Sequence, residues 1–252
     1  MPRIGIIGAM RQELAAVLAR MPDERRQCIG GRDFWAGHWY GHEVVAVLSR
    51  MGKVAAATTA TALIERFAVS HIVFTGVAGG LGDDVRIGDV VLANAFVQHD
   101  MDASPLFARH EVPLYGRARF ETDTDLTEHL AHAARTVLAC PGQTLGADAV
   151  AEFDLRASRG HTGLIASGDR FIATAAASAE LRQALPDALA VEMEGAAVAQ
   201  VCYDYGVPFA ALRIISDHAG AGAHVDFIRF IDRIASRYSA AILEAYFAKL
   251  QK

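Results

Sequence analysis

Two glutamates, Glu192 and Glu194, interrupt an otherwise apolar run, AVEMEGAAVA, at residues 190–199. Glutamate is almost never fully buried without a partner. If a helix opens at this pair, side chains two positions apart point to nearly opposite sides, so one of the two faces the interior. A buried carboxylate needs a polar partner from the protein, from water or from a ligand hydroxyl. The run therefore predicts a functional carboxylate at a helix start, where free amides favour negative charge.

Four other stretches carry groups that could bind a ligand or transfer a proton. Glu13 lies in GAMRQE, glycines fill TGVAGGL at 75–81, SGDRFI spans 167–172, and Asp217 follows the apolar strand of RIISDHA. Glycines let backbone amides approach a ligand closely. Taken singly, each stretch is as well explained by a tight turn, a first-turn carboxylate or an N-cap. Their joint occurrence at predicted strand ends favours a ligand site, because ligands of open α/β sheets bind there.

The elements that must position these groups alternate along the chain. Strands are predicted over 3–9, 71–77, 88–100, 163–168 and 207–217, with a two-stranded section at 33–49 that turns at 40–42. Helices are predicted over 11–21, 52–67, 124–139, from the glutamate pair onward, and over 227–250, while 101–121 is irregular. Continuous apolar strands indicate a sheet covered on both faces. The alternation indicates one α/β domain spanning 1–252.

Composition narrows the function classes. The net charge of -5 argues against a nucleic-acid surface. No stretch reaches the roughly 20 apolar residues of a membrane span. The N-terminus reads as a first strand rather than a signal peptide. Three scattered cysteines, Cys28, Cys140 and Cys202, form no disulfide framework, which favours a reducing cytoplasm.

Eight stretches together resemble the 5'-methylthioadenosine/S-adenosylhomocysteine nucleosidases of the nucleoside phosphorylase superfamily. They are IGIIGAMRQE, SRMGKVAAA, FTGVAGGL, GDVVLAN, QHDMDAS, GLIASGDRFI, AVEMEGAAVAQVC and VPFAALRIISD. The resemblance implies a three-layer α/β sandwich with a mixed, partly barrel-like central sheet flanked by helices, assembled as a homodimer. It also implies hydrolysis of the N-glycosidic bond of these nucleosides, releasing adenine without a cofactor or metal. The resemblance leaves the 5' substituent open, with 5'-deoxyadenosine and 6-amino-6-deoxyfutalosine as alternative expected substrates.

The resemblance assigns the catalytic roles. Glu13 matches the residue that activates the attacking water, Asp217 matches the general acid that protonates adenine N7, and Arg213 matches an arginine near both the water and the catalytic glutamate. General acid catalysis typically contributes about 10²–10⁴-fold. Apolar neighbours in the strand before Asp217 could help that carboxyl hold a proton. Two carboxylates on opposite sides of a scissile glycosidic bond are also the arrangement of glycosidases.

The resemblance further assigns the substrate contacts. Glu194 matches the glutamate that holds the ribose hydroxyls, and Met193 packs against the sugar. Glu192, the outer glutamate of the motif, has a supporting role at most. For adenine, Phe171 matches the stacking residue and Ile172 the residue whose backbone contacts the edge of the base. Ser216 lies beside the acid, and Ala78 and Gly79 lie in the glycine loop. The apolar wall around the sugar and the thioalkyl group is matched by Met10, Met51 and Phe227.

Two segments depart from the family pattern. Val77 stands where some members have serine, which removes one hydrogen bond near the attacking water. Residues 100–120 align less closely with the family, in which a loop here crosses to the partner subunit and covers its thioalkyl pocket. Leu106, Phe107 and Pro113 are the candidate lid residues.

Two alternative functions stay open. A purine nucleoside phosphorylase would bind phosphate near the first loop, where Glu13 would repel it and Arg11 would attract it. A nucleoside-binding sensor would need no water-activating base. Metal sites at QHDMD or at His218 and His224 lack a further ligand at suitable spacing. His99 and Asp100 are better explained as ties for the loop that follows their strand.

Overall fold

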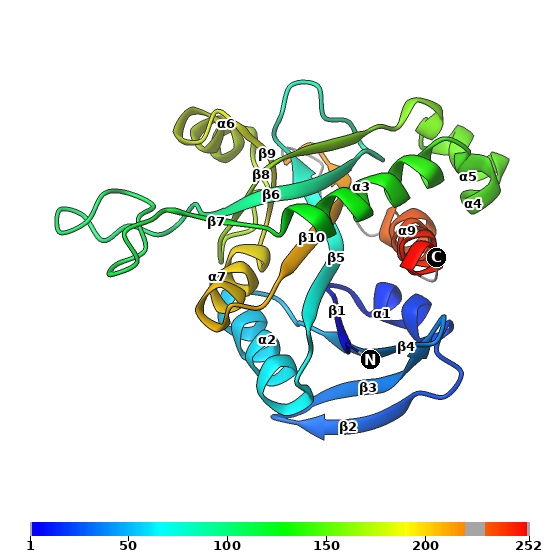
Figure 1. Ribbon diagram of the computed structural model, residues 1–252. Coiled ribbons are helices and arrows are strands. Elements are labelled where there is room, and N and C mark those ends of the chain that lie inside the picture. Colours follow the sequence, from blue (N-terminus) through cyan, green and yellow to red (C-terminus); the bar gives the residue numbers. More distant parts are fainter. Residues whose placement is uncertain (1, 220–229, 251–252) are drawn as a thin grey trace.

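Five strands close into a barrel at the centre of the molecule (Figure 1). The computed structural model describes residues 2–219 and 230–250. Around the barrel, β5 pairs with β10, β10 with β6, β6 with β8, β8 with β9, and β9 again with β5. The β10–β6 and β9–β5 pairs are antiparallel and the others parallel, so the sheet is mixed. The strands are β5 (His71–Gly80), β6 (Val90–Gln98), β8 (Gly160–Ser167), β9 (Ala188–Glu192) and β10 (Phe209–Asp217).

The sheet continues beyond the barrel through β5. Strand β1 lies between β5 and β4 and runs parallel to both, and the antiparallel strands β3 and β2 follow. This pairing places Gly8, at the end of β1, beside Thr75 of β5, so the first helix starts next to the glycine-rich part of β5. The strands are β1 (Ile4–Gly8), β2 (Arg25–Ile29), β3 (Arg32–Trp39) and β4 (His42–Leu48), with the short β7 (Arg119–Glu121) on the edge of β6.

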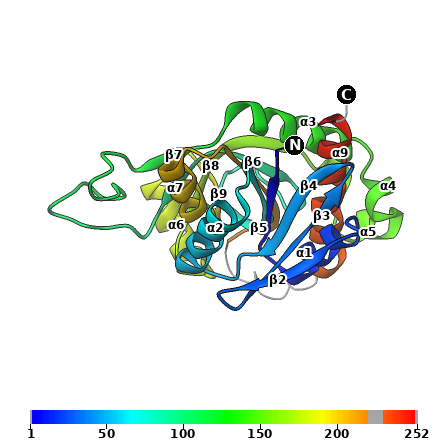
Figure 2. The ribbon, with the colours of Figure 1, turned by 60° about the horizontal axis from the view of Figure 1, so that its bottom comes forward.

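Helices cover both faces of the sheet (Figures 1 and 2). One buried apolar cluster joins the sheet to α1 (Arg11–Leu18), α3 (Thr124–Leu138) and α9 (Ser236–Leu250), and a second joins it to α2 (Lys53–Phe67) and α7 (Gly195–Tyr205). Neighbouring strand residues alternate between the two clusters, with Ile6 in the first and Ile7 in the second. Strands buried on both faces are apolar along most of their length. The expected three-layer architecture is confirmed.

The predicted helix at the glutamate pair is wrong for Glu192. Residues 188–192 form β9, which pairs with β8 and β5, and α7 begins only at Gly195. Both Glu192 and Glu194 are buried, so the expectation that only one faces the interior is also wrong. Closure of the barrel requires a strand between β8 and β5, and this tertiary requirement outweighs the helix preference of an alanine-rich segment.

Several short elements have no counterpart among the sequence predictions. Strand β2 has an exposed polar sequence, RRQCI, and is held at the edge of the sheet by backbone pairing with β3. The others are α4 (Pro141–Leu145), α5 (Ala147–Glu152), η1 (Leu155–Ala157), α6 (Ala175–Ala184) and the π-helical turn η2 (Ile231–Ala235). Residues 227–229 of the predicted closing helix lie outside the described residues; 230–250 are helical, as expected.

The chain between β6 and β7 extends away from the rest of the molecule (Figures 1 and 2). It is irregular, as predicted, and carries two highly exposed leucines, Leu106 at 84% and Leu114 at 92%. In the described parts of the chain, no helix combines the length and apolar character that a membrane crossing requires.

Candidate active site

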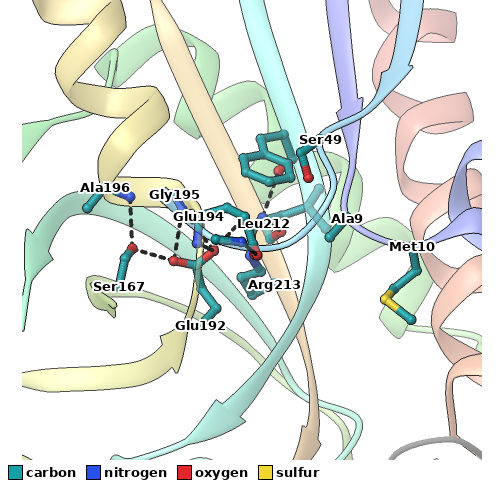
Figure 3. Close-up of polar contacts among 12 residues, drawn as sticks. Ala9, Met10, Ser49, Ser167, Glu192, Glu194, Gly195, Ala196, Leu212 and Arg213 are labelled. Carbon is teal, nitrogen blue, oxygen red and sulfur yellow. Dashed lines mark hydrogen bonds and ion pairs between the residues drawn. The ribbon is translucent and has the colours of Figure 1, made fainter. Parts of the chain in front are cut away.

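A buried ion pair between Arg213 and Glu192 lies at the centre of the candidate site (Figure 3). Nη2 of Arg213 is 2.8 Å from Oε2 of Glu192, and the arginine side chain is 0% exposed. Nη1 donates to the carbonyls of Leu212 at 3.0 Å and Phe74 at 3.3 Å. The guanidinium carbon also lies 4.0 Å from the centre of the Phe74 ring. A buried charge is tolerated when it is paired and hydrogen-bonded in this way.

The Glu192 carboxylate also organises the start of α7. It accepts the amides of Glu194 at 3.1 Å and Gly195 at 2.9 Å, and the hydroxyl of Ser167 donates to it. The same hydroxyl oxygen accepts the amide of Ala196 at 2.8 Å. Helix N-termini present free amides that favour an anion. Glu192, expected to have a supporting role at most, is thus the ion-pair partner of Arg213 and the link from β8 and β9 to α7.

Glu194 is the second buried carboxylate of the motif, 6% exposed. Its Oε1 accepts the amide of Gly52 at 2.8 Å. Burial and the neighbouring charge of Glu192 raise the pKa of Glu194 to about 7, against the opposing effects of the Gly52 amide and Arg213. When ionised, such a carboxylate can accept hydrogen bonds from two hydroxyls at once.

Glu13 is fully buried in the first turn of α1. Its Oε2 accepts the amides of Met10 at 2.9 Å and Ala9 at 3.1 Å. Within the described ranges, its Oε1 has no hydrogen-bond partner. Burial raises the pKa of Glu13 to about 7, although the two amides and the charge of Arg213 oppose the shift. A carboxylate with a pKa near neutrality is suited to general base catalysis.

Gly76 in β5 lies between Arg213 and Ala9, the residue whose amide binds Glu13. A Cβ at this glycine would lie 3.0 Å from the Cβ of Ala9 and 3.4 Å from Cζ and Nε of Arg213. This Nε is buried and, among the residues that the structure describes, has no hydrogen-bond partner. A free acceptor on Glu13 and a free donor on Arg213 therefore occur in the same region of the interior.

Asp217 ends β10 and is 4% exposed. Its Oδ2 accepts the hydroxyl of Ser216 at 2.9 Å, and its Oδ1 accepts the amide of Ala219 at 2.7 Å. A Cβ at Gly79 would lie 3.1 Å from Oδ1, so this glycine allows the close approach. The register of β10 against β5 shifts just before Asp217, an irregularity that re-aims a side chain. Three residues lie between Arg213 and Asp217, and because of the shift these two pair with Gly76 and Gly79, about 10 Å apart along β5.

The other predicted contacts differ in exposure. Ile172 is buried at 7%, whereas Phe171 is 45% and Met51 75% exposed. Met10 and Met193 are partly buried.

The predicted site residues thus form two groups joined by β10. One contains Glu13, Glu192, Glu194 and Arg213. The other contains Ala78, Gly79, Ser216 and Asp217, in which the Ser216 hydroxyl lies 3.4 Å from the Ala78 carbonyl oxygen. Phe227 and His224 lie outside the described residues.

Sequence reasoning missed Gly52 and Ser167 as contributors to the site. The signal for Gly52 was present, since it directly precedes a predicted helix whose first amides must find acceptors. Asp100 does tie down the segment after β6, as expected, through Lys53 at 2.6 Å and the amide of Asp169 at 2.8 Å. Over the described ranges, no group of three or more histidine, cysteine, aspartate or glutamate side chains is arranged to hold a metal.

Comparison with known proteins identifies similar chains. A family model described as the phosphorylase superfamily matches residues 3–248. The 5'-methylthioadenosine/S-adenosylhomocysteine nucleosidase of Chromohalobacter salexigens is 37% identical over 251 residues, covering 99% of this chain and 98% of that protein. The solved structure of such a nucleosidase from Neisseria meningitidis, in complex with methylthio-immucillin-A, gives a TM-score of 0.86 at 33% identity, covering 99% and 100% of the two chains. Futalosine hydrolase of Helicobacter pylori gives 0.85 at 32%, covering 98% of each.

The buried ion pair yields a stability prediction. Arg213→Met leaves Glu192 without its charged partner, which should lower the free energy of unfolding by about 3–5 kcal/mol in urea denaturation. Adding Glu192→Gln to this variant should recover part of the loss, because the unpaired charge is removed. Arg119→Met, which breaks the exposed pair with Asp187, should cost less than about 1 kcal/mol. Independent, additive losses from Arg213→Met and Glu192→Gln would contradict the coupling.

Proposed function

The chain belongs to the 5'-methylthioadenosine/S-adenosylhomocysteine nucleosidases of the phosphorylase superfamily, and we propose on this basis that it hydrolyses the N-glycosidic bond of both nucleosides, releasing adenine. One observation supports hydrolysis most directly. Glu13 is fully buried, has a pKa raised to about 7, is within electrostatic range of Arg213 and, among the described residues, has one carboxylate oxygen without a hydrogen-bond partner. This is the arrangement that activation of a water molecule requires.

Attack begins at Glu13 in the proposed mechanism. The two amides that bind Oε2 leave Oε1 to take a proton from the attacking water. The Nε of Arg213 is a donor suited to orient the same water. Glu192 holds the guanidinium in place through the ion pair and does not itself meet the water.

Asp217 acts as the general acid at the other end of the substrate. Adenine leaves readily only when its ring nitrogen is protonated, and the carboxyl of Asp217 supplies that proton to N7. The separation of about 10 Å along the sheet between Arg213 and Asp217 leaves room for the reacting part of a nucleoside between the two groups. The contacts from Ser216 and Ala219 set the orientation of this carboxyl.

Glu194 binds the ribose hydroxyls. Its Gly52 contact fixes one oxygen, and a vicinal diol provides two donors to an ionised carboxylate. Met193 packs against the sugar and Met10 against the thioalkyl side. Phe171 stacks on adenine while the backbone of Ile172 binds the edge of the base.

The rival functions receive less support. Phosphate in place of water would be placed against the buried carboxylate of Glu13, whereas Arg11 is exposed. A sensor without turnover would have no use for the buried base. The 5' substituent stays open to the alternatives, and the similarity to a futalosine hydrolase supports testing 6-amino-6-deoxyfutalosine beside the two thionucleosides. Val77 offers no side-chain hydrogen bond to the water.

The molecule acts as a homodimer in this proposal. The chain between β6 and β7 extends away from the rest of the molecule (Figures 1 and 2), and its Leu106 and Leu114 are highly exposed. Met51 and Phe171, which belong to the proposed site, are also exposed. Exposed apolar residues of this kind mark interaction surfaces. In a dimer with two-fold symmetry, residues 106–113 of the second copy would cover Met51 and Phe171 of the first.

The proposed location is the cytoplasm. Cys28, Cys140 and Cys202 are all free thiols, two of them exposed. Free exposed thiols persist where the environment is reducing.

The reaction itself is tested by adenine release from methylthioadenosine in buffers with and without phosphate, with analysis of the sugar product. We expect equal rates in both buffers and free methylthioribose as the product, because water is the nucleophile. A requirement for phosphate, with a sugar 1-phosphate as the product, would establish a phosphorylase. Binding without release of adenine would support the sensor.

The two raised pKa values predict a steep acidic limb. Glu13 must be ionised to accept a proton and Glu194 to accept two hydroxyls, and both protonate as the pH falls through about 7. We therefore expect log kcat/KM for methylthioadenosine to fall with a slope approaching 2 between pH 6.5 and about 5, since kcat/KM reports the free enzyme.

Substitutions distinguish the contributions of the Glu13 and Glu194 carboxylates to this pH dependence. Glu194→Gln should lower kcat/KM and reduce the slope to 1. Glu13→Gln should lower kcat about 10²–10⁴-fold while an adenosine analogue still binds. An unchanged slope in Glu194→Gln would exclude ionisation of Glu194 as a requirement.

The dimer is tested by light scattering and by activity. Leu106→Glu combined with Leu114→Glu should shift the protein to monomer and weaken methylthioadenosine binding, because the partner's loop no longer covers the site. Ala151→Glu adds one such charge on α5, on an exposed residue away from this loop, and should leave a dimer (Figure 1). A wild-type monomer with full activity would overturn this proposal.

A further inference from the structure

Three charged residues from three distant segments form a closed ring beside Glu194, which we call the Lys53 clasp. Nζ of Lys53 donates to Oδ1 of Asp100 at 2.6 Å, and Oδ2 of Asp100 accepts the amide of Asp169 at 2.8 Å. Oδ1 of Asp169 in turn accepts the amide of Lys53 at 2.7 Å. The ring therefore joins the first residue of α2 to the residues that follow β6 and β8.

Among the described residues, the Lys53–Asp100 pair of the clasp is less exposed than the other surface ion pairs between lysine or arginine and carboxylates. The Lys53 and Asp100 side chains are 16% and 28% exposed. Nζ of Lys53 also donates to Oε1 of Gln98 at 3.0 Å. The Gln98 side chain is buried, and its Nε2 donates to Oε1 of Gln200 in α7 at 2.8 Å. Burial alone would raise the pKa of Asp100, but the hydrogen bonds from Lys53 and Asp169 outweigh it and the pKa is lowered. The carboxylate stays ionised and available to the ring.

Members of the clasp are close in sequence to residues that serve the two parts of the proposed nucleoside site, the ribose part and the adenine part. Gly52, directly before Lys53, donates its amide to Glu194 at 2.8 Å. Gly52 has a φ of 92°, and a Cβ there would lie 3.0 Å from Oδ1 of Asp169. Two consecutive amides at the start of α2 thus bind the proposed ribose carboxylate and the clasp. On the other side, Asp169 precedes the 171–172 segment assigned to adenine by only two residues.

We propose that Lys53, Asp100 and Asp169 are positioning residues that set the spacing between Glu194 and the 169–172 segment, and so between the ribose and adenine contacts. The inference rests on the proposed function for the identity of the substrate. None of the three side chains has to touch the nucleoside. Their effect passes through the Gly52 amide to Glu194 and through the backbone of Asp169 to the base-binding segment.

The test compares methylthioadenosine with its 3'-deoxy and 2'-deoxy analogues on wild type and on Lys53→Met. If the clasp positions Glu194, the substitution should lower kcat/KM for methylthioadenosine about tenfold, mainly through KM. It should lower kcat/KM much less for at least one deoxy analogue, because that analogue already lacks a hydroxyl contact with Glu194. The differing intrinsic reactivity of the analogues cancels, since each is compared between two enzymes.

Further variants separate positioning from general damage. Lys53→Arg keeps a charged donor and should restore most of the kcat/KM for methylthioadenosine. Asp169→Ala removes the oxygen that accepts the Lys53 amide, at the exposed member of the ring, and should reproduce the selective loss even if Lys53→Met fails to fold. Arg119→Met, which breaks an exposed arginine–aspartate pair outside the clasp, is the matched control and should change none of the ratios.

Two results would overturn the proposal: equal fold-losses for methylthioadenosine and both deoxy analogues, or no loss at all in Lys53→Met and Asp169→Ala. Failure of wild type to hydrolyse methylthioadenosine would instead refute the proposed function. In that case calorimetric affinities for adenosine and 3'-deoxyadenosine on the same variants carry the same comparison. A selective loss of adenosine affinity would support the clasp, and parallel losses would reject it.

Discussion

The Arg213–Glu192 ion pair is the interaction on which the rest of the site depends. Arginine cannot lose its charge inside a protein, so a fully buried guanidinium must be matched by a carboxylate and by carbonyl acceptors. Glu192 supplies the carboxylate from the end of β9, and β5 and β10 supply the carbonyls. Closing the barrel is therefore what brings the two charges together, and the same carboxylate then caps the start of α7.

One guanidinium acts on three glutamates, but burial is the largest cause of the raised pKa values of Glu13 and Glu194. Glu192 takes the direct contact at 2.8 Å. Glu13 and Glu194 experience the same positive charge at longer range, where it lowers each pKa by less than burial raises it. Both therefore titrate near neutrality instead of near 4.5. Such a pKa lets a carboxylate exchange a proton at physiological pH, which a fully paired glutamate would not do.

Much of the fold was predictable from pattern alone. The continuous apolar strands at 71–77 and 207–217 require cover on both faces, and the structure provides it. Strand β9 was not predictable, because ALAVE is five residues of helix-favouring composition whose strand conformation exists only through pairing with β8 and β5. For the same reason Glu192 could not be distinguished from Glu194 by spacing: helical periodicity was applied to residues that leave a strand.

The sequence by itself determined which chemical groups are present, and the glutamate, aspartate and glycine motifs indicated the family and a two-carboxylate reaction. Local rules reach only a few residues, so they identified Glu13 at a helix start and Asp217 at a strand end. The tertiary structure decided which charges are paired, which oxygens are free and which pKa values shift. Those properties depend on burial and on contacts such as Gly52 with Glu194 and Lys53 with Asp100, whose partners lie far apart along the chain and meet only when the barrel closes.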